Sequence, residues 1–279
     1  MTNKTLRFLC LTSLLTLPLW ASPNDFDFVT ITFPGSTVTV AEAINDAGQL
    51  VGIYNPAAIR RGFLLSGGSF SSIDFPGATI TTAFGVNDRG QIVGRYVSGN
   101  VGHGYLLSDG NFTTIDPPGS TSTVVFGIND HAQVVGRYTS GGLSHAFVRS
   151  GGSFTTLDVP GASFTEAGSI NNRGEIVGDY ISGGVDHGFL LSGGVFRRID
   201  FPGATTTIAF GINDRGEIVG RYESNGVTHG FRLSGGSFTT IDIPGSSFTQ
   251  AIGINARGQI VGEYRRPGID AGFLATPAP

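Results

Sequence analysis

The sequence predicts an all-β protein, a six-bladed β-propeller made of six four-stranded repeats. Three observations carry this prediction: a strict 42-residue period, four short β-rich segments in each period, and a complementary pair of segments at the two ends. Six periods fill residues 26–277 without insertion or deletion. Repeats of this length with four strands are typical of propeller blades, and a single domain over residues 22–279 is therefore expected.

The period is visible in single columns of identical residues. One asparagine recurs every 42 residues, at Asn45, Asn87, Asn129, Asn171, Asn213 and Asn255. A tyrosine (from Tyr54 to Tyr264) and a Pro-Gly pair (from Pro34 to Pro244) recur at the same spacing. Such regularity indicates that each repeat folds as the same supersecondary unit.

The fifth repeat shows the four strands well. Two β-rich runs, residues 206–213 and 217–222, are joined by a tight turn that contains Asp214, Arg215 and Gly216. A loop then leads to a third run and a Gly-Gly turn to a fourth, which Pro-Gly ends. Gly can adopt the positive φ that such hairpin turns need, and no segment has helical periodicity.

The chain ends predict how the propeller closes. Residues 25–36 align with the fourth strand of a repeat, whereas residues 271–277 are a third strand with no fourth strand after them. The first segment can therefore complete the last blade and close the ring, which leaves no unpaired edge there. An open solenoid would need atypical capping repeats, and none is present.

Composition excludes several classes. Glycine accounts for 44 of 279 residues, which argues against a helix-rich protein. A mean hydropathy of +0.12 is too apolar for a disordered chain. The net charge of −4 gives no sign of a nucleic-acid partner.

The first 21 residues have the pattern of a secretory signal peptide. Lys4 and Arg7 precede a 13-residue, mostly apolar stretch, and Ala21 suits a cleavage site. Cleavage would remove Cys10, the only cysteine, so disulfides are not expected. No second apolar run follows, which predicts a secreted protein, extracellular or periplasmic, without membrane contact after cleavage.

The repeat resembles a bacterial extracellular repeat family named for its His-Ala-Phe (HAF) motif. The third repeat carries the motif as His145-Ala146-Phe147, after the sequence Gly-Ile-Asn-Asp at residues 127–130. The resemblance covers residues 26–277 and implies an extracellular propeller-like protein, but it implies no particular reaction. Some relatives carry a C-terminal sorting anchor. This chain ends in ATPAP, so the resemblance implies release to the periplasm or medium.

Periodic histidines and aspartates invite a metal-site interpretation, which their placement opposes. Equivalent positions on different blades lie far apart, whereas zinc ligands lie about 2 Å from one ion. We expect structural hydrogen bonds instead, no metal and no cofactor. The histidines are His103, His145, His187 and His229, and the aspartates are Asp74, Asp116, Asp158, Asp200 and Asp242.

The turns between first and second strands carry further polar residues. Asn-Asp pairs are explained by turn formation rather than by calcium. Arginines recur beside them, and either an anion site or pairing with neighbouring acids such as Asp88 and Asp214 is open. The arginines are Arg89, Arg173, Arg215 and Arg257.

Departures from the repeat are the better guide to a binding site. Glu42 stands in a column of Phe84, Phe126, Gly168, Phe210 and Ile252. The phenylalanines of that column are expected between blades. Loops of the first and last blades, neighbours in a closed ring, carry a basic cluster. The predicted binding residues are Glu42, Arg60, Arg61, Arg265 and Arg266.

Two functions remain open. The near-uniform repeats favour a secreted, monomeric, non-catalytic binding or scaffold module for an extracellular glycan or protein, with no catalytic residue assigned. The alternative is an extracellular hydrolase or lyase with its site at the channel mouth. No nucleophile motif is present, but convergence of Glu42, Glu166 and an arginine in one deep pocket would favour the enzyme.

Overall fold

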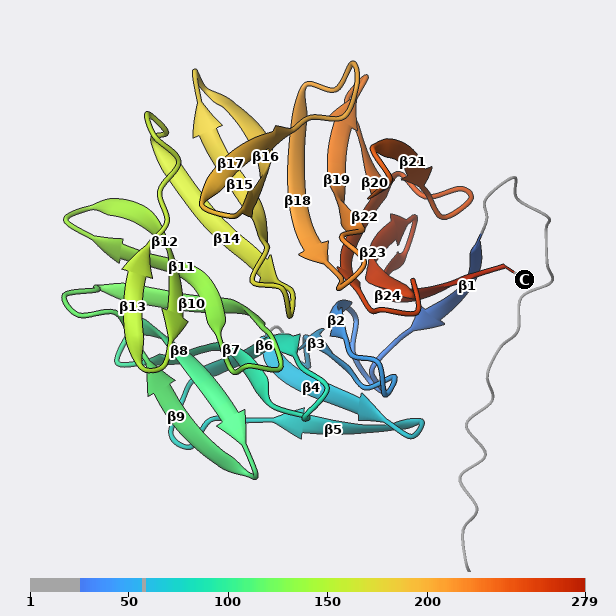
Figure 1. The fold of residues 1–279 in the computed structure, drawn as a ribbon. Coiled ribbons are helices and arrows are strands. Elements are labelled where there is room, and N and C mark those ends of the chain that lie inside the picture. The colour runs from blue at the N-terminus through green and yellow to red at the C-terminus, as the bar shows by residue number, and fades with distance from the viewer. Residues whose placement is uncertain (1–25, 57–58, 279) are drawn as a thin grey trace, which may run out of the picture.

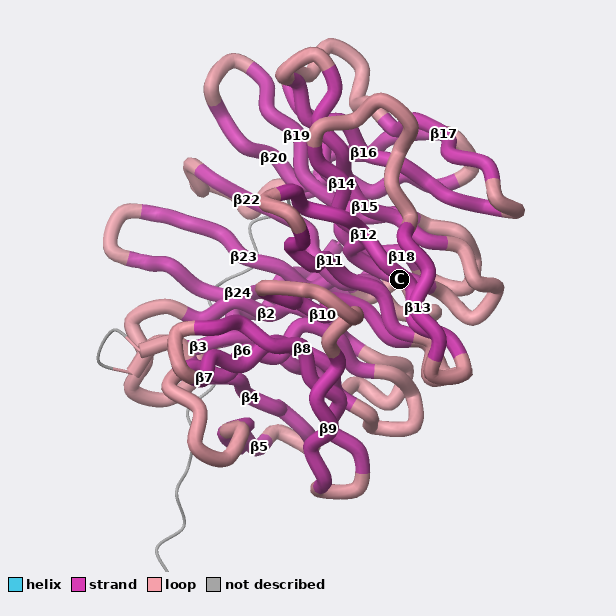
Figure 2. The backbone as a smooth tube through the Cα atoms, turned by 90° about the vertical axis from the view of Figure 1, so that its left-hand side faces the viewer, coloured by secondary structure: helices cyan, strands magenta, loops and turns pink. Residues whose placement is uncertain are grey.

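The sheets of this protein are arranged around a common axis as a β-propeller (Figure 1). The computed structural model describes residues 26–56 and 59–278, so the predicted signal peptide lies outside the described residues. Figure 2 shows strands joined by turns and loops, and the described ranges contain no helix. Accordingly, no helix within those ranges is long and apolar enough to cross a membrane.

Four sheets have four strands each, in the order of the chain. The first contains β2 (Thr39–Ile44), β3 (Leu50–Tyr54), β4 (Arg61–Ser66) and β5 (Ser69–Ile73). The second contains β6 (Ile80–Val86), β7 (Ile92–Ser98), β8 (Val101–Ser108) and β9 (Asn111–Ile115). The third contains β10 (Ser122–Ile128), β11 (Val134–Ser140), β12 (Leu143–Ser150) and β13 (Ser153–Thr156). The fourth contains β14 (Phe164–Ile170), β15 (Ile176–Ser182), β16 (Val185–Ser192) and β17 (Val195–Ile199).

The remaining strands form one eight-stranded sheet. Its first half contains β18 (Thr206–Ile212), β19 (Ile218–Ser224), β20 (Val227–Ser234) and β21 (Ser237–Ile241). Its second half contains β22 (Phe248–Ile254), β23 (Ile260–Arg266), β24 (Ile269–Pro277) and β1 (Phe26–Ile31). The sequence predicted six separate sheets, and the structure differs here. A single parallel bridge between Thr228 and Phe248 joins the two halves, because the backbones of neighbouring sheets approach closely at this point.

The start and end of the described chain meet in one sheet. β1 pairs antiparallel with β24 over six residues, from Phe26 opposite Pro277 to Ile31 opposite Gly272. Figure 1 shows β1 lying beside β24. These are the two segments expected from the sequence to meet.

A β-bulge in the first strand of every repeat decides what faces the axis. In β6 the ladder with β7 shifts between Ala83 and Gly85, so Phe84 is the extra residue. A bulge re-aims a side chain, because it breaks the alternation of the strand. The residues at this position are Glu42, Phe84, Phe126, Gly168, Phe210 and Ile252, and all of them line a central cavity. The prediction that Phe84, Phe126 and Phe210 pack between blades is therefore wrong.

The core lies between neighbouring sheets. One cluster joins Val51 and Ile73 of the first sheet to Ala83, Ile92 and Tyr105 of the second. The aromatic residues of the third strands are at most 1% exposed, namely Phe63, Tyr105, Phe147, Phe189, Phe231 and Phe273. Each such ring contacts one from the fourth strand, as Phe231 does Phe238 at 5.4 Å between centroids. Full burial of a Phe side chain is worth about 1.5–3 kcal/mol, so this packing stabilises the propeller without disulfides.

Glycine in the second strand makes room for those rings. A Cβ on Gly220 would lie 2.0 Å from the Ile208 carbonyl oxygen and 2.6 Å from the Phe231 ring. Atoms cannot approach so closely, so no other residue fits there without moving the backbone.

Candidate functional site

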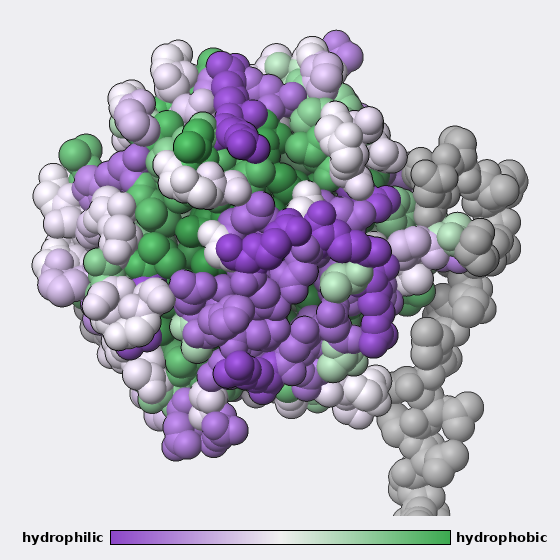
Figure 3. Space-filling model, viewed as in Figure 1, coloured by the Kyte–Doolittle hydropathy of each residue, from purple (hydrophilic) through white to green (hydrophobic). Residues whose placement is uncertain are grey.

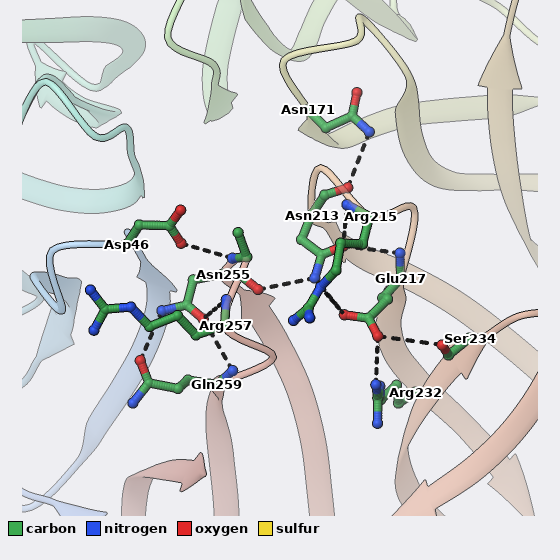
Figure 4. Close-up of polar contacts among 11 residues, drawn as sticks. Asp46, Asn171, Asn213, Arg215, Glu217, Arg232, Ser234, Asn255, Arg257 and Gln259 are labelled. Carbon is green, nitrogen blue, oxygen red and sulfur yellow. Dashed lines mark hydrogen bonds and ion pairs between the residues drawn. The ribbon is translucent and has the colours of Figure 1, made fainter. Parts of the chain in front are cut away.

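One end of the propeller axis carries a circuit of asparagine side chains, here called the Asn ring. Each side-chain amide donates to the backbone carbonyl of the equivalent asparagine in the next repeat at 2.9–3.1 Å, and Asn255 donates to Asn45. Figure 4 shows the two bonds that join Asn171, Asn213 and Asn255. The members are Asn45, Asn87, Asn129, Asn171, Asn213 and Asn255. Asn213 also donates to Glu217, and its side-chain oxygen accepts two backbone N–H bonds. The Asn ring is therefore fully hydrogen-bonded.

A second polar layer surrounds the Asn ring. The N–H of Asp88 donates to Asp130 at 2.9 Å, and Asn172 donates to both Asp130 and Asp214 at 2.8 Å. The turn arginines pair differently from the expectation: Arg173 binds Glu175 at 2.6 Å and Arg215 contacts Glu217 at 3.3 Å, not the turn aspartates. The glutamate lies two residues further along the same hairpin, within easy reach. Figure 3 shows hydrophilic side chains gathered over the middle of this face, where the β14–β15 and β18–β19 turns converge in Figure 1.

The periodic histidines lie beside the periodic aspartates. Nδ1 of each histidine is 2.6–3.0 Å from a carboxylate oxygen, in the pairs His103–Asp116, His145–Asp158, His187–Asp200 and His229–Asp242. In the first sheet Arg61 takes the place of histidine and binds Asp74. Over the described ranges no group of three or more His, Cys, Asp or Glu residues is arranged to hold a metal ion.

The predicted basic cluster divides into two parts. Arg265 donates to Glu263 at 2.7 Å, and Arg60 acts electrostatically on Glu42, so both belong to the surroundings of the axis. Arg61 instead binds Asp74 on the outer part of its sheet. Arg266 binds the Pro244 carbonyl and lies over the Tyr264 ring, 5.3 Å from its centroid.

The residues that break the repeat meet in a cavity of about 210 Å³ on the axis, here called the axial cavity. Glu42 of β2, Glu166 of β14 and Gln250 of β22 line it together with three phenylalanines. The Asn ring lines a second, shallower hollow on the same axis. Six aliphatic residues line both the axial cavity and this hollow and form a collar between them: Ile44, Val86, Ile128, Ile170, Ile212 and Ile254. A mostly apolar cavity with a few polar groups is the usual form of a small-molecule site.

Burial shapes the charge of Glu42. Loss of hydration and the nearby Glu263 raise the pKa of Glu42 to about 8, although Arg60 acts in the opposite direction. No hydrogen bond joins the Glu42 carboxyl to another side chain of the described residues. At neutral pH this carboxyl is therefore mostly protonated and can donate a hydrogen bond.

Glu166 lies in the same cavity but has a partner. Its Oε2 is 2.8 Å from Nε of Arg137, which belongs to the neighbouring sheet. Burial nonetheless raises the pKa of Glu166, and burial beside Glu166 raises the pKa of Asp179 well above its usual range. The cavity-lining Glu166 thus has one guanidinium and a second carboxyl close behind it.

A third polar group lies on β22 and β23. Gln250 donates to Glu263 at 2.9 Å, and its side-chain oxygen is 3.4 Å from Arg221. Glu263 is 4% exposed and also accepts from Arg265, yet burial raises its pKa. This chain orients the Gln250 amide at the cavity wall.

Sequence reasoning identified Glu42 and noted Glu166, but it missed the residues behind them. A signal was present in the second strands, where one column reads Ile53, Arg95, Arg137, Asp179, Arg221 and Glu263. A column that changes charge from repeat to repeat cannot serve a repeated packing role. The residues of this column lie on the second strand, which pairs with the first strand of the same repeat. They therefore lie next to the cavity residues, as Asp179 lies opposite Glu166.

Comparison with known proteins supports the fold. Virginiamycin B lyase from Staphylococcus aureus is similar with a TM-score of 0.54 and 10% identity, over 90% of this chain and 99% of that one. The β-propeller domain of the Trilobed protease from Pyrococcus furiosus gives 0.51 and 9%, over 85% and 95%. Trypanosoma rangeli sialidase gives 0.51 and 9%, over 86% and 54%. At these identities the likeness defines a class, the β-propellers, and no more.

Sequence comparisons add nothing beyond that class. No protein-family model matches the chain, and no curated protein matches it.

Proposed function

We propose that this protein is an exported, closed six-bladed β-propeller that binds an extracellular ligand, a glycan or a group on a protein, in its axial cavity. In this proposal the eight-stranded sheet consists of two blades that touch at the Thr228–Phe248 bridge. Support comes from the hydrogen bond of Asn255 to Asn45 and from the β1–β24 pairing. A single domain with HAF-type repeats and a cleaved signal peptide completes this proposal.

The observation that carries the binding proposal is the contrast between repeated and unrepeated residues. The repeats copy their turns and rings, and four of them copy a His–Asp pair. Glu42, Glu166 and Gln250 of the cavity instead stand at positions where other repeats have an apolar residue. Repeated residues serve the fold equally in every blade. Residues that differ between repeats and converge in one cavity serve no common packing role. A few such polar groups in an otherwise apolar cavity are typical of a ligand site.

A ligand screen on the chain that begins at residue 22 tests this proposal. We expect a glycan array or a thermal-shift library to yield a ligand that raises Tm, and Ile252→Phe to abolish its binding by filling the cavity. Val227→Phe, at a hairpin where Val227 is 38% exposed, is the matched control. A ligand that binds both variants as well as the wild type lies elsewhere and contradicts the proposal.

A second candidate function, a hydrolase or lyase, is favoured by one observation. Glu42 and Glu166 share the cavity, and Arg137 contacts Glu166. A protonated carboxyl is a general acid at neutral pH. Mass spectrometry of a bound ligand separates the two functions: an enzyme would convert the ligand and lose this conversion in Glu166→Gln, whereas a binding protein would return it unchanged.

A further inference from the structure

Glu42 differs from Glu166 and Glu263, the other glutamates around the axial cavity, in having no partner. Glu166 has Arg137 at 2.8 Å, and Glu263 has Arg265 at 2.7 Å and Gln250 at 2.9 Å. The Glu42 carboxyl lines the cavity, and among residues 26–56 and 59–278 no side chain forms a hydrogen bond or ion pair with it. Burial of an unpaired carboxylate is costly, so the ionised form of Glu42 would need a positive charge beside it.

The surrounding arginines do not supply that charge. Arg137 and Arg265 are already paired with carboxylates, and Arg221 lies 3.4 Å from Gln250 and over the Phe210 ring. Arg60 is exposed in the loop between β3 and β4 and acts on Glu42 only at a distance. No lysine or arginine is among the described residues that line the cavity.

The remaining wall suits an organic cation. Phe84, Phe126 and Phe210 face the cavity from β6, β10 and β18, and the first two lie 5.2 Å apart between centroids. Aromatic faces attract cations through the ring quadrupole, most strongly where water is excluded. Arg221 already lies 5.8 Å above Phe210, which leaves Phe84 and Phe126 for a ligand.

We infer that the axial cavity binds a small organic ammonium compound, with Glu42 as counter-ion and the Phe84 and Phe126 rings against its apolar body. This inference rests on the proposed function and names the chemical class of its ligand. In size, a 150 Å³ apolar cavity holds benzene. The 210 Å³ of the axial cavity therefore suits a ligand of roughly ten non-hydrogen atoms.

Binding of this ligand is coupled to a proton. The charged groups that act on Glu42 are Glu263 from β23 and Arg60 from the β3–β4 loop. Glu166, which is paired with Arg137, lines the same cavity. Glu42 is mostly protonated at pH 7, because its pKa is about 8. An ammonium ligand favours the carboxylate, so each binding event transfers about one proton from Glu42 to solvent. Affinity then rises about tenfold per pH unit below pH 8.

Titration calorimetry with two isosteric probes tests the inference. The probes are 2-phenylethylamine, which stays protonated over pH 6–8, and the neutral 2-phenylethanol. We expect the amine to bind more tightly than the alcohol, about tenfold more tightly at pH 7 than at pH 6, with about one proton released in buffers of different ionisation enthalpy. Glu42→Gln should remove the amine preference and its pH dependence. Glu223→Gln, on β19 outside the cavity lining, is the matched control.

The outcomes separate this inference from the proposed function. Amine binding that is absent, independent of pH or unchanged in Glu42→Gln overturns the inference. If the alcohol or a glycan still binds and Ile252→Phe abolishes that binding, the axial cavity remains a ligand site of another class. If neither probe nor any glycan binds a protein whose Tm is that of the folded wild type, both proposals fail.

Discussion

The Asn ring and the axial cavity lie on the same axis, separated by one aliphatic collar, yet they differ in symmetry and in charge. Every member of the Asn ring is an asparagine, and each donates to the next repeat. The axial cavity has phenylalanine from three repeats but Glu42, Glu166 and Gln250 from the others, and Glu42 has no partner among the described residues. Where the repeat is uniform, polar groups satisfy one another. Where it is broken, the cavity holds the carboxyl of Glu42 without a partner among the described residues.

Deletion of β1 is expected to have the largest effect on the uniform part of the molecule. A chain that starts at residue 34 loses the six-residue pairing with β24 and two buried side chains, Phe26 and Ile31. Backbone bonds at about 1 kcal/mol each, together with this burial, predict a loss of about 5 kcal/mol or more. Urea denaturation measures it, with a chain that starts at residue 24 as control. An unchanged midpoint would show that the stability of the propeller does not depend on β1.

Glu42→Gln should stabilise the protein in a pH-dependent way. The pKa of Glu42 is about 8 in the folded protein, against 4.5 for an ordinary glutamate. Between these two pH values the folded state therefore keeps a proton that the unfolded state has released. Wild-type stability should therefore fall relative to the variant as pH rises from about 4.5 to 8, by about 3 to 5 kcal/mol in total. Urea denaturation at pH 5, 6, 7 and 8 measures the difference. A constant difference would mean that Glu42 titrates normally.

Asn129→Ala tests the Asn ring, the uniform part of the axis. The Asn129 side chain donates to Asn171 and Gln133 and accepts from two backbone N–H groups. Its loss leaves buried polar groups unpaired, and we expect a loss of about 2–3 kcal/mol. Asn111→Ala, at an exposed position, should cost less than about 0.5 kcal/mol. Equal effects of the two variants in thermal denaturation would refute a structural role for the Asn ring.

Arg173→Ala should have the smallest effect. Arg173 binds Glu175 at 2.6 Å, but its side chain is 51% exposed. Exposed ion pairs contribute under about 1 kcal/mol and are weakened by salt. A larger loss in Tm, persisting at high salt, would show that the layer around the Asn ring is more than a solvated surface.

Much of the fold could be predicted from the sequence because the period and the turn chemistry are local. The column of asparagines marked the hairpin turns, and Gly216 adopts φ +78° in one of them. The orientation of Phe84 could not be predicted in the same way. Strict alternation of side chains along the strand predicted that Phe84 lies between blades. The bulge between Ala83 and Gly85 instead turns Phe84 toward the axis.

By itself the sequence determined the repeat, its strands and turns, and the isolated position of Glu42. Only the tertiary structure decided that Glu42, Glu166 and Gln250, on three strands far apart in the chain, line one cavity. The physical reason is that a side chain's direction in a strand changes with a one-residue shift in register. A bulge introduces that shift through contacts with the neighbouring strand, and the arrangement around the axis brings the shifted side chains together.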